Sequence, residues 1–253
     1  MRILVIKLSS LGDVAHALPA VRALKDRTGA EIDWVVQPEY APLLACCPDV
    51  ARTIAFPRRH VARGIFPFLR ELRREKYDDV VDLQGLLKSA VAARLARGRR
   101  CVGPAWAREG AHRFYDAQPA RAAGPRRHAV EELMDVANLV APGAGAPPAP
   151  RLAFPEPESD GDPGPHVALA PFSRWRTKDW PLEKFAELGQ RLSKEMGCRL
   201  RIVGGRDDAE AGEELARRIG PGARNLCGHT DLPGLCSLLT AMDLLVTVDS
   251  GPM

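Results

Sequence analysis

The chain has 253 residues, of which 45% are hydrophobic and 27% charged, so it is long enough for one large or two ordinary domains with buried cores. No apolar run approaches the roughly 20 residues of a membrane-spanning helix, and the apolar start is too short for a signal peptide, so we expect a cytoplasmic protein. The six cysteines show no Cys-x-x-Cys spacing and no paired histidines nearby, which argues against a zinc site or a disulfide framework.

The formal net charge of +4 hides an uneven distribution. Residues 51–127 contain 18 lysines and arginines against 7 acidic residues, so the rest of the chain is net negative. Such a surplus is compatible with binding to nucleic acid, to an anionic membrane surface or to an anionic substrate. A solvated arginine-rich surface explains the charge alone equally well.

Buried strands alternate with helices from the first residue onward, which is typical of a doubly wound parallel sheet. In the first half we predict strands at Arg2–Leu8, Glu31–Val36, Arg52–Phe56, Asp78–Leu83 and Cys101–Val102. The helical patterns between and after them lie at Val14–Asp26, Glu39–Cys46, Phe68–Glu75, Leu86–Leu95 and Val130–Leu139.

A stretch rich in proline, glycine and alanine then interrupts the pattern. We predict a first domain over residues 1–145, a linker over 146–165 and a second domain over 166–253. In the second domain the strands are predicted at His166–Ala170, Arg199–Val203, near Asn225 and at Leu244–Val248, and the helices at Leu182–Glu195, Ala209–Ile219 and Leu232–Ala241. The chain ends on Asp249-Ser-Gly-Pro-Met253, which reads as a helix start, so we expect the second domain to be incomplete.

The first strand runs into a short polar loop that ends in a carboxylate, Asp13. Ligands of open parallel sheets bind at the carboxyl ends of the strands, so Asp13 is a candidate general base. The fourth strand ends in Asp82-Leu-Gln-Gly-Leu-Leu-Lys-Ser-Ala90, where Gln84, Lys88 and Ser89 are candidates for binding a polar, anionic acceptor. Lys88 is equally compatible with a solvated helix position.

A basic cluster of Arg58, Arg59, His60 and Arg63 precedes the apolar run Gly64–Leu69. A lipid with phosphorylated or acidic head groups would suit this combination, although aromatic residues more often belong to the core.

In the second domain, Ser173-Arg-Trp-Arg-Thr-Lys-Asp-Trp-Pro181 follows the first strand and brings hydroxyls, three cations and helix amides together, as a diphosphate requires. The alternative is a basic loop in which Asp179 caps the next helix. Gly204-Gly-Arg-Asp-Asp208 could supply a carboxylate to ribose hydroxyls but is also a common turn. Asp249-Ser-Gly251 is either a further phosphate site or a simple helix cap.

These motifs together resemble the bacterial lipopolysaccharide heptosyltransferases, glycosyltransferase family 9. The resemblance rests on Lys7–Pro19, on Asp82–Ala90, on Lys178-Asp-Trp-Pro181, on Gly-Gly-x-x-Asp208 and on Asp249–Met253, which occur in register along the whole chain. Trp34-Val-Val, Ala107–Tyr115 and Arg127–Glu131 make the first domain most similar to heptosyltransferase I.

The resemblance implies a GT-B type fold, with two Rossmann-like doubly wound domains that face a cleft. It implies an inverting transfer of L-glycero-D-manno-heptose from ADP-heptose to Kdo of Kdo-lipid A, peripheral to the cytoplasmic face of the inner membrane. Asp13 would be the catalytic base. The nucleotide-sugar site would comprise Ser173, Lys178, Thr230, Asp249, Ser250 and Gly251, with Arg174 or Arg176 sharing the phosphate role and either Asp208 or Glu210 binding ribose. The acceptor site would comprise Ser10, Gly12, Arg58, Arg59, Arg63, Gln84, Lys88 and His128.

One carboxylate is enough for inversion, because it removes the proton of the acceptor hydroxyl while ADP departs from the opposite face. Lys178 and helix amides can stabilise the departing ADP, and no Asp-x-Asp triplet is placed to hold a metal, so we expect neither a metal nor a cofactor. A nicotinamide-dependent oxidoreductase should carry Gly-x-Gly-x-x-Gly after the first strand, where this chain has Ser9-Ser-Leu-Gly-Asp13.

Alternatives stay open both within the enzyme family and outside it. Heptosyltransferase II or another family 9 transferase would share the motifs. A non-catalytic module that binds anionic surfaces would explain the arginines but not Asp13. We expect no nucleic-acid partner, and DNA binding that depends on salt and ignores ADP would contradict this.

Overall fold

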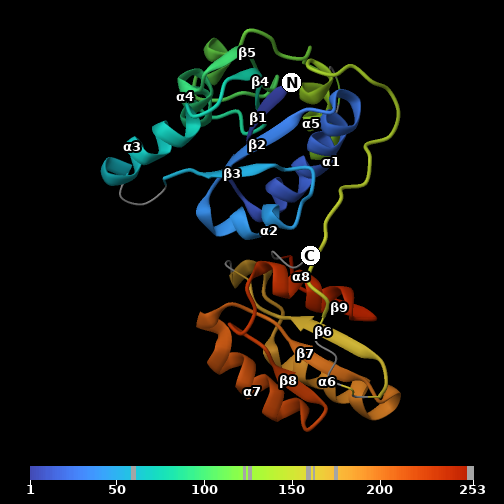
Figure 1. Ribbon diagram of the computed structural model, residues 1–253. Helices are drawn as coiled ribbons and strands as arrows, with labels where there is room; N and C mark the ends of the chain where they lie inside the picture. The colour runs from blue at the N-terminus through green and yellow to red at the C-terminus, as the bar shows by residue number, and fades with distance from the viewer. Residues whose placement is uncertain are drawn as a thin grey trace. The chain divides into compact units, whose positions relative to one another are not determined.

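The computed structural model describes residues 1–57, 61–121, 124, 127–157, 161, 163–173 and 176–249, without the side chains of residues 61–63 and 176. The chain divides into two compact units, Met1–Ala153 and Phe154–Met253, each built around a parallel sheet (Figure 1). The division falls inside the proline-rich stretch, and the three-part domain scheme with a separate linker stays a prediction. Among the described residues no helix is both long and apolar enough to cross a membrane.

The sheet of unit 1 has five parallel strands in the order β3-β2-β1-β4-β5. These strands are β1 Arg2–Ile6, β2 Glu31–Val36, β3 Arg52–Ala55, β4 Tyr77–Asp82 and β5 Gly98–Val102. The helices are α1 Leu11–Thr28, α2 Ala41–Ala45, α3 Val61–Leu72, α4 Leu87–Leu95 and α5 Ala129–Asn138, with short 3₁₀ helices at Pro38–Tyr40 and Ala111–Phe114. The predicted doubly wound α/β fold is therefore confirmed for unit 1.

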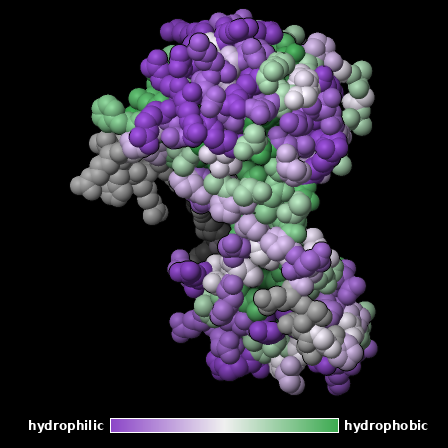
Figure 2. All heavy atoms as spheres, in the orientation of Figure 1, coloured by the Kyte–Doolittle hydropathy of each residue, from purple (hydrophilic) through white to green (hydrophobic). Residues whose placement is uncertain are grey.

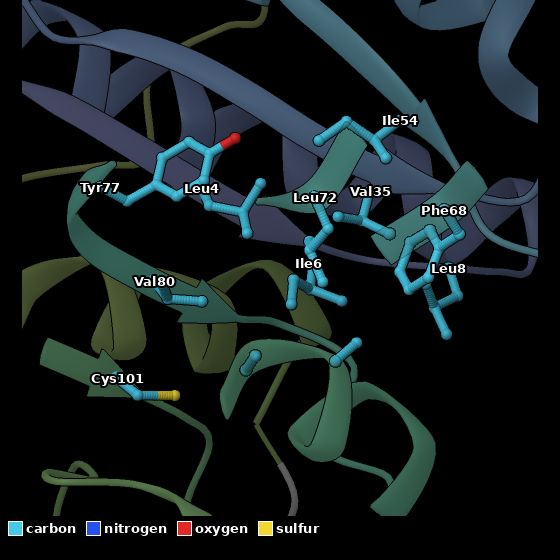
Figure 3. Packing of buried hydrophobic residues seen from close by; sticks show 12 residues of the cluster. Leu4, Ile6, Leu8, Val35, Ile54, Phe68, Leu72, Tyr77, Val80 and Cys101 are labelled. Atoms are coloured by element: carbon cyan, nitrogen blue, oxygen red, sulfur yellow. The ribbon is translucent and has the colours of Figure 1, made fainter. Parts of the chain in front are cut away.

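Helices cover both faces of this sheet, which explains why its strands are apolar along nearly their whole length. Phe68 and Leu72 of α3 pack with Leu4 and Ile6 of β1 and with Val35 of β2, and Figure 3 shows these side chains converging. On the other face α1 packs against α5. The strands are therefore buried between helices on both faces, and the loops at the carboxyl edge extend from this packed sheet.

Three predicted boundaries were wrong in ways that matter for the site. Helix α1 begins at Leu11 rather than Val14, so Asp13 lies in the first helical turn rather than in a loop. Helix α3 begins at Val61 rather than Phe68, because burial of Phe68 and Leu72 outweighs the helix-breaking tendency of Gly64 and Pro67. Strand β5 begins at Gly98, since its first residues are exposed and polar and gave no strand pattern.

Unit 2 repeats the architecture with four parallel strands in the order β8-β7-β6-β9. The strands are β6 His166–Ala170, β7 Arg199–Ile202, β8 Ala223–Asn225 and β9 Leu244–Thr247, and the helices are α6 Leu182–Met196, α7 Ala209–Ile219 and α8 Leu232–Thr240. Short 3₁₀ helices occur at Arg176–Lys178 and Arg206–Asp208. Phe185 of α6 and Leu215 of α7 belong to its hydrophobic core. The elements predicted for this half differ from the observed ones by at most one residue at either end.

A buried polar cluster ties β2, β3 and β4 together. The Asp33 carboxylate is 1% exposed and accepts hydrogen bonds from the Tyr77 hydroxyl at 2.8 Å and from Nη2 of Arg52 at 2.6 Å. Burial and the neighbouring Asp33 raise the pKa of Tyr77, so the phenol remains a donor. These donors compensate the desolvation of the carboxylate, which would otherwise destabilise the sheet.

We predict that Tyr77→Phe lowers the free energy of unfolding by about 1–3 kcal/mol, because Asp33 loses a donor in a buried position. Tyr40→Phe is the matched control, since the Tyr40 hydroxyl has no hydrogen-bond partner in the described part of the chain. Denaturant-dependent hydrogen exchange of the β1 and β2 amides measures both variants. Equal effects of the two substitutions would contradict the stabilising role of the cluster.

Candidate functional site

The order of strands in unit 1 reverses between β1 and β4, so the loops that follow these two strands lie side by side at the carboxyl edge of the sheet. A cavity of about 610 Å³ opens there. The residues that line it include Lys7, Asp13, Gln84, Trp106, Arg108 and Arg121. The structure thus brings together two residues predicted from sequence, Asp13 and Gln84, with several that were not predicted.

Asp13 is the third residue of α1 and is exposed. Its Oδ2 accepts hydrogen bonds from the backbone amide and from the hydroxyl of Ser10, both at 2.9 Å. An acid in the first turn that binds back to the residue before the helix stabilises the helix start. Within the described residues Oδ1 accepts no hydrogen bond, so one carboxylate oxygen is available to a substrate while the other is fixed.

Lys7 directly follows β1 and lines the same cavity as Asp13. It is only 6% exposed, and its Nζ donates a hydrogen bond to the carbonyl of Leu83 at 3.0 Å. Burial lowers the pKa of Lys7, whereas the charges of Asp13 and Asp82 act in the opposite direction. Lys7 and the candidate base therefore line the same cavity, and the charge of Asp13 acts on Lys7.

The loop after β4 is organised by Asp82, whose side chain is fully buried. Its Oδ1 accepts hydrogen bonds from the amides of Gln84 at 2.8 Å and Gly85 at 3.2 Å, and its Oδ2 accepts one from the Tyr115 hydroxyl at 2.7 Å. Burial raises the pKa of Asp82, and these donors oppose that rise. The turn requires glycine at position 85, because φ is +72° and an added Cβ would lie 2.7 Å from Cγ of Pro104.

Charged side chains surround the remaining wall of the cavity. The guanidinium group of Arg127 forms ion pairs with the carboxylates of Asp135 at 2.5 Å and Glu131 at 3.2 Å. Arg108 and Arg121 are exposed and form no ion pair among the described residues, so their guanidinium groups can bind an anionic ligand.

The other predicted acceptor residues are not among those that line the cavity, or lie outside the described part of the structure. Ser10 and Gly12 flank Asp13 at the start of α1, and Lys88 is exposed on α4. His128 precedes α5, accepts a hydrogen bond from the amide of Val130 at 3.3 Å, and packs edge-on against His16. Arg58 and Arg59 lie outside the described residues, as does the side chain of Arg63 in α3.

The second set of candidates lies at the equivalent edge of the sheet in unit 2, where the strand order reverses between β6 and β9. Lys178 follows β6 and Asp249 follows β9, and their charged groups form an ion pair at 2.5 Å. The Ser173 hydroxyl donates to Asp179 at 2.7 Å. Asp179 therefore binds the loop, and the alternative in which it caps α6 is wrong because Pro181 occupies the cap position.

The candidates for binding ribose are close in sequence but differ in their surroundings. Asp208 precedes α7, and its Oδ2 accepts a hydrogen bond from the Gly205 amide at 2.8 Å, whereas Glu210 is exposed in the first turn of α7. Thr230 precedes α8, next to Asp231, which caps that helix. Arg174, Ser250 and Gly251 lie outside the described residues, as does the side chain of Arg176.

Sequence reasoning missed Lys7, Arg108 and Arg121 as members of the cavity wall. Lys7 carried a signal, because a single lysine at the end of an otherwise apolar strand is buried only where its charge is compensated. The amide of Arg108 donates to the carbonyl of Gly85 in the loop after β4, and Arg121 lies in an irregular segment that lines the same cavity. No local sequence pattern indicates either placement. The residues that the structure describes contain no group of histidine, cysteine or acidic side chains able to hold a metal ion.

Residues 65–253 match the family model of glycosyltransferase family 9 (heptosyltransferase). Lipopolysaccharide heptosyltransferase 1 of Pseudomonas aeruginosa is 34% identical over 99% of this chain and 74% of its own length. The E. coli heptosyltransferase WaaC, solved with ADP, matches with a TM-score of 0.83 at 28% identity, covering 99% of this chain and 82% of that one. It was also solved with ADP-2-deoxy-2-fluoro heptose, and this structure matches with a TM-score of 0.80 at 28% identity, over 99% and 84% of the two chains.

The E. coli ADP-heptose lps heptosyltransferase II matches with a TM-score of 0.83 at 25% identity, over 99% of this chain and 80% of that one. The resemblance found in the sequence motifs, the two Rossmann-like sheets and these matches agree with one another. The chain belongs to glycosyltransferase family 9, the heptosyltransferase family.

Proposed function

We propose that this protein transfers L-glycero-D-manno-heptose from ADP-heptose to Kdo of Kdo-lipid A, with inversion at the anomeric carbon, in the synthesis of the lipopolysaccharide core. The observation that carries the proposal is the Asp13 carboxylate, which shares a cavity with Lys7 at the switch point of the first sheet. ADP-heptose is suggested as the donor because the similar E. coli enzyme WaaC was solved with ADP and with ADP-2-deoxy-2-fluoro heptose. We expect ADP release when ADP-heptose and Kdo-lipid A are both present, and no release when either one is supplied alone.

In this mechanism Asp13 is the general base. A hydroxyl of the acceptor donates its proton to the carboxylate as its oxygen forms a bond to the anomeric carbon, and the bond between that carbon and the phosphate oxygen breaks on the opposite face. The bonding electrons leave with ADP. Since Ser10 fixes one oxygen of the carboxylate, the base holds its orientation before the acceptor arrives.

The leaving ADP requires positive charge close to the phosphates, and Lys178 is the candidate that supplies it. Asp249 pairs with Lys178, and a diphosphate would compete with this carboxylate for the ammonium group. Ser173, like Lys178, lies in the loop that follows β6. Asp208 or Glu210 would bind the ribose. We propose that the reaction uses neither a metal nor a cofactor, because cationic side chains and amides can stabilise the departing charge.

The acceptor is a sugar acid, and the cavity offers it three cations, Lys7, Arg108 and Arg121. Heptosyltransferase II and other members of the family remain alternatives, and the acceptor distinguishes them. Transfer to Kdo-lipid A supports heptosyltransferase I, whereas transfer only to an acceptor that already carries a heptose supports heptosyltransferase II. A module that merely binds anionic surfaces would bind Kdo-lipid A without releasing ADP.

We further propose that the protein acts at the cytoplasmic face of the inner membrane, because its acceptor is a lipid. Helix α3 is amphipathic, and its Phe66 is 78% exposed while Phe68 on the same helix is buried. Figure 2 shows hydrophobic atoms at the α3 end of unit 1 on the viewed face. An exposed aromatic side chain next to a basic stretch of sequence is suited to insertion among anionic head groups.

Asp13→Asn should lower kcat by about 10²- to 10⁴-fold, the usual contribution of a general base. Asparagine keeps an oxygen that accepts the Ser10 hydrogen bond, so helix α1 should start as before. Asp26→Asn, near the other end of the same helix, is the control and should keep full activity. ADP release measures each variant, and undiminished release by Asp13→Asn would exclude this residue as the base.

Lys178→Met should raise the KM for ADP-heptose by about 10- to 100-fold, because a charge-assisted hydrogen bond to phosphate is lost. Lys184→Met is the matched control, since Lys184 lies on the exposed surface of α6 and pairs with Glu187. Steady-state kinetics at saturating acceptor measure the two variants. An unchanged donor KM in Lys178→Met would remove Lys178 from the phosphate site.

Phe66→Ser should weaken binding to vesicles that contain anionic lipid, by about 5- to 20-fold, because burial of one aromatic side chain is lost. Met196→Ser, which changes an exposed hydrophobic residue of unit 2, is the control. Co-sedimentation with vesicles measures both. Equal binding of Phe66→Ser and the unmodified protein would place the membrane contact elsewhere.

A further inference from the structure

Gln84 links the two loops that meet at the switch point of the first sheet. Its Oε1 accepts hydrogen bonds from the backbone amides of Leu8 at 2.9 Å and Ser9 at 3.2 Å. These amides follow the last residue of β1 and lie directly before Ser10, where the segment turns into helix α1. One side-chain oxygen therefore satisfies two consecutive donors that have left the sheet.

The backbone of Gln84 is itself held in place by the buried side chain of Asp82. The buried Asp82 carboxylate binds the amides of Gln84 and Gly85, and the Tyr115 hydroxyl binds the same carboxylate. Gly85 adopts a φ of +72° in a space that Pro104 closes to any side chain. The loop after β4 is consequently rigid, and a rigid partner transmits its position to the segment that it binds.

The orientation of the Gln84 amide group follows from these contacts. Because both backbone donors bind Oε1, the carbonyl end of the side chain faces the Leu8–Ser9 segment. Gln84 also lines the cavity that contains Asp13. Its main contacts are thus to the protein backbone, whereas the sequence motif suggested a residue that binds the acceptor.

We propose that Gln84 is a positioning residue, which holds the segment Leu8–Ser10 and thereby fixes Asp13 for removal of the acceptor proton. This inference rests on the proposed function, since it concerns the same base. Asp13 is bound to Ser10 through Oδ2, so any movement of the segment from Leu8 to Ser10 moves the carboxylate. Displacement of a catalytic group by about 1 Å can reduce turnover by about 100-fold.

Two substitutions separate positioning from acceptor binding. Gln84→Met keeps the length of the side chain and removes the accepting oxygen, so kcat should fall by about 10- to 100-fold while the KM for the acceptor changes little. Gln84→Glu keeps an oxygen that accepts both amide hydrogen bonds, so kcat should stay within about threefold of the unmodified protein. The added negative charge should raise the KM for an anionic acceptor. Each variant is measured at its own optimal pH.

Hydrogen exchange provides a second readout that does not depend on turnover. The amides of Leu8 and Ser9 should exchange faster in Gln84→Met and at the original rate in Gln84→Glu. The amide of Lys7, which donates to the carbonyl of Val35, is the internal control and should be unchanged. Gln190→Met controls for loss of a glutamine elsewhere, because Gln190 donates to the Arg218 carbonyl in unit 2.

Lower kcat together with faster Leu8 and Ser9 exchange in Gln84→Met, both restored in Gln84→Glu, is the expected result. In Gln84→Met, an increase in the acceptor KM with no fall in kcat would assign Gln84 to acceptor binding and overturn the inference. Unchanged exchange would also overturn it, whatever happens to kcat. If the unmodified protein transfers no heptose, the proposed function fails by itself, and the exchange data still decide whether Gln84 holds the segment.

Discussion

The structure depends on one property of parallel sheets, namely that backbone amides beyond the carboxyl end of a strand have no partners in the ladder. In unit 1 the strand order places the ends of β1 and β4 next to each other, and the side chains of Gln84 and Asp82 satisfy amides of both segments. An unpaired buried amide costs about as much as a lost hydrogen bond. The same contacts that remove this cost also join the loop after β4 to the segment that leads into helix α1, in whose first turn Asp13 lies.

Unit 2 meets the same requirement with different residues. After β7, the Asp208 carboxylate binds the amide of Gly205, and before α8 the Asp231 carboxylate binds that of Gly234. After β6, however, Lys178 has its main charged partner on another loop, Asp249. That pair is exposed and therefore weak in water, so an anion of higher charge can replace the carboxylate at little cost. The first edge is organised by the acceptors Gln84 and Asp82, whereas in the second an exchangeable ion pair joins the loops after β6 and β9.

Much of this arrangement could be predicted from the sequence because it is local. Alternation of apolar strands with helices gave both sheets, and the polar loop after β1 gave Asp13 as a candidate. The start of α1 at Leu11 was missed because the local Ser10–Asp13 capping contacts precede the apolar periodicity of the helix. The hydrogen bonds from Leu8 and Ser9 to Gln84, by contrast, join residues far apart in the chain. Burial of Phe68 and Leu72, which also depends on distant residues, extended α3 through Gly64 and Pro67. Contacts between residues far apart in the chain leave no pattern in a single sequence.

Lys7 illustrates why such contacts matter for chemistry. Taking an ammonium group out of water is unfavourable, and its only hydrogen bond among the described residues goes to the Leu83 carbonyl. The charges of Asp13 and Asp82 compensate part of that cost, which joins the lysine to the candidate base electrostatically. The desolvation has already occurred on folding, so an anionic group entering the cavity meets a charge that needs no further reorganisation. A buried lysine, which would destabilise an apolar core, therefore gives this cavity a site at which an anionic group can bind.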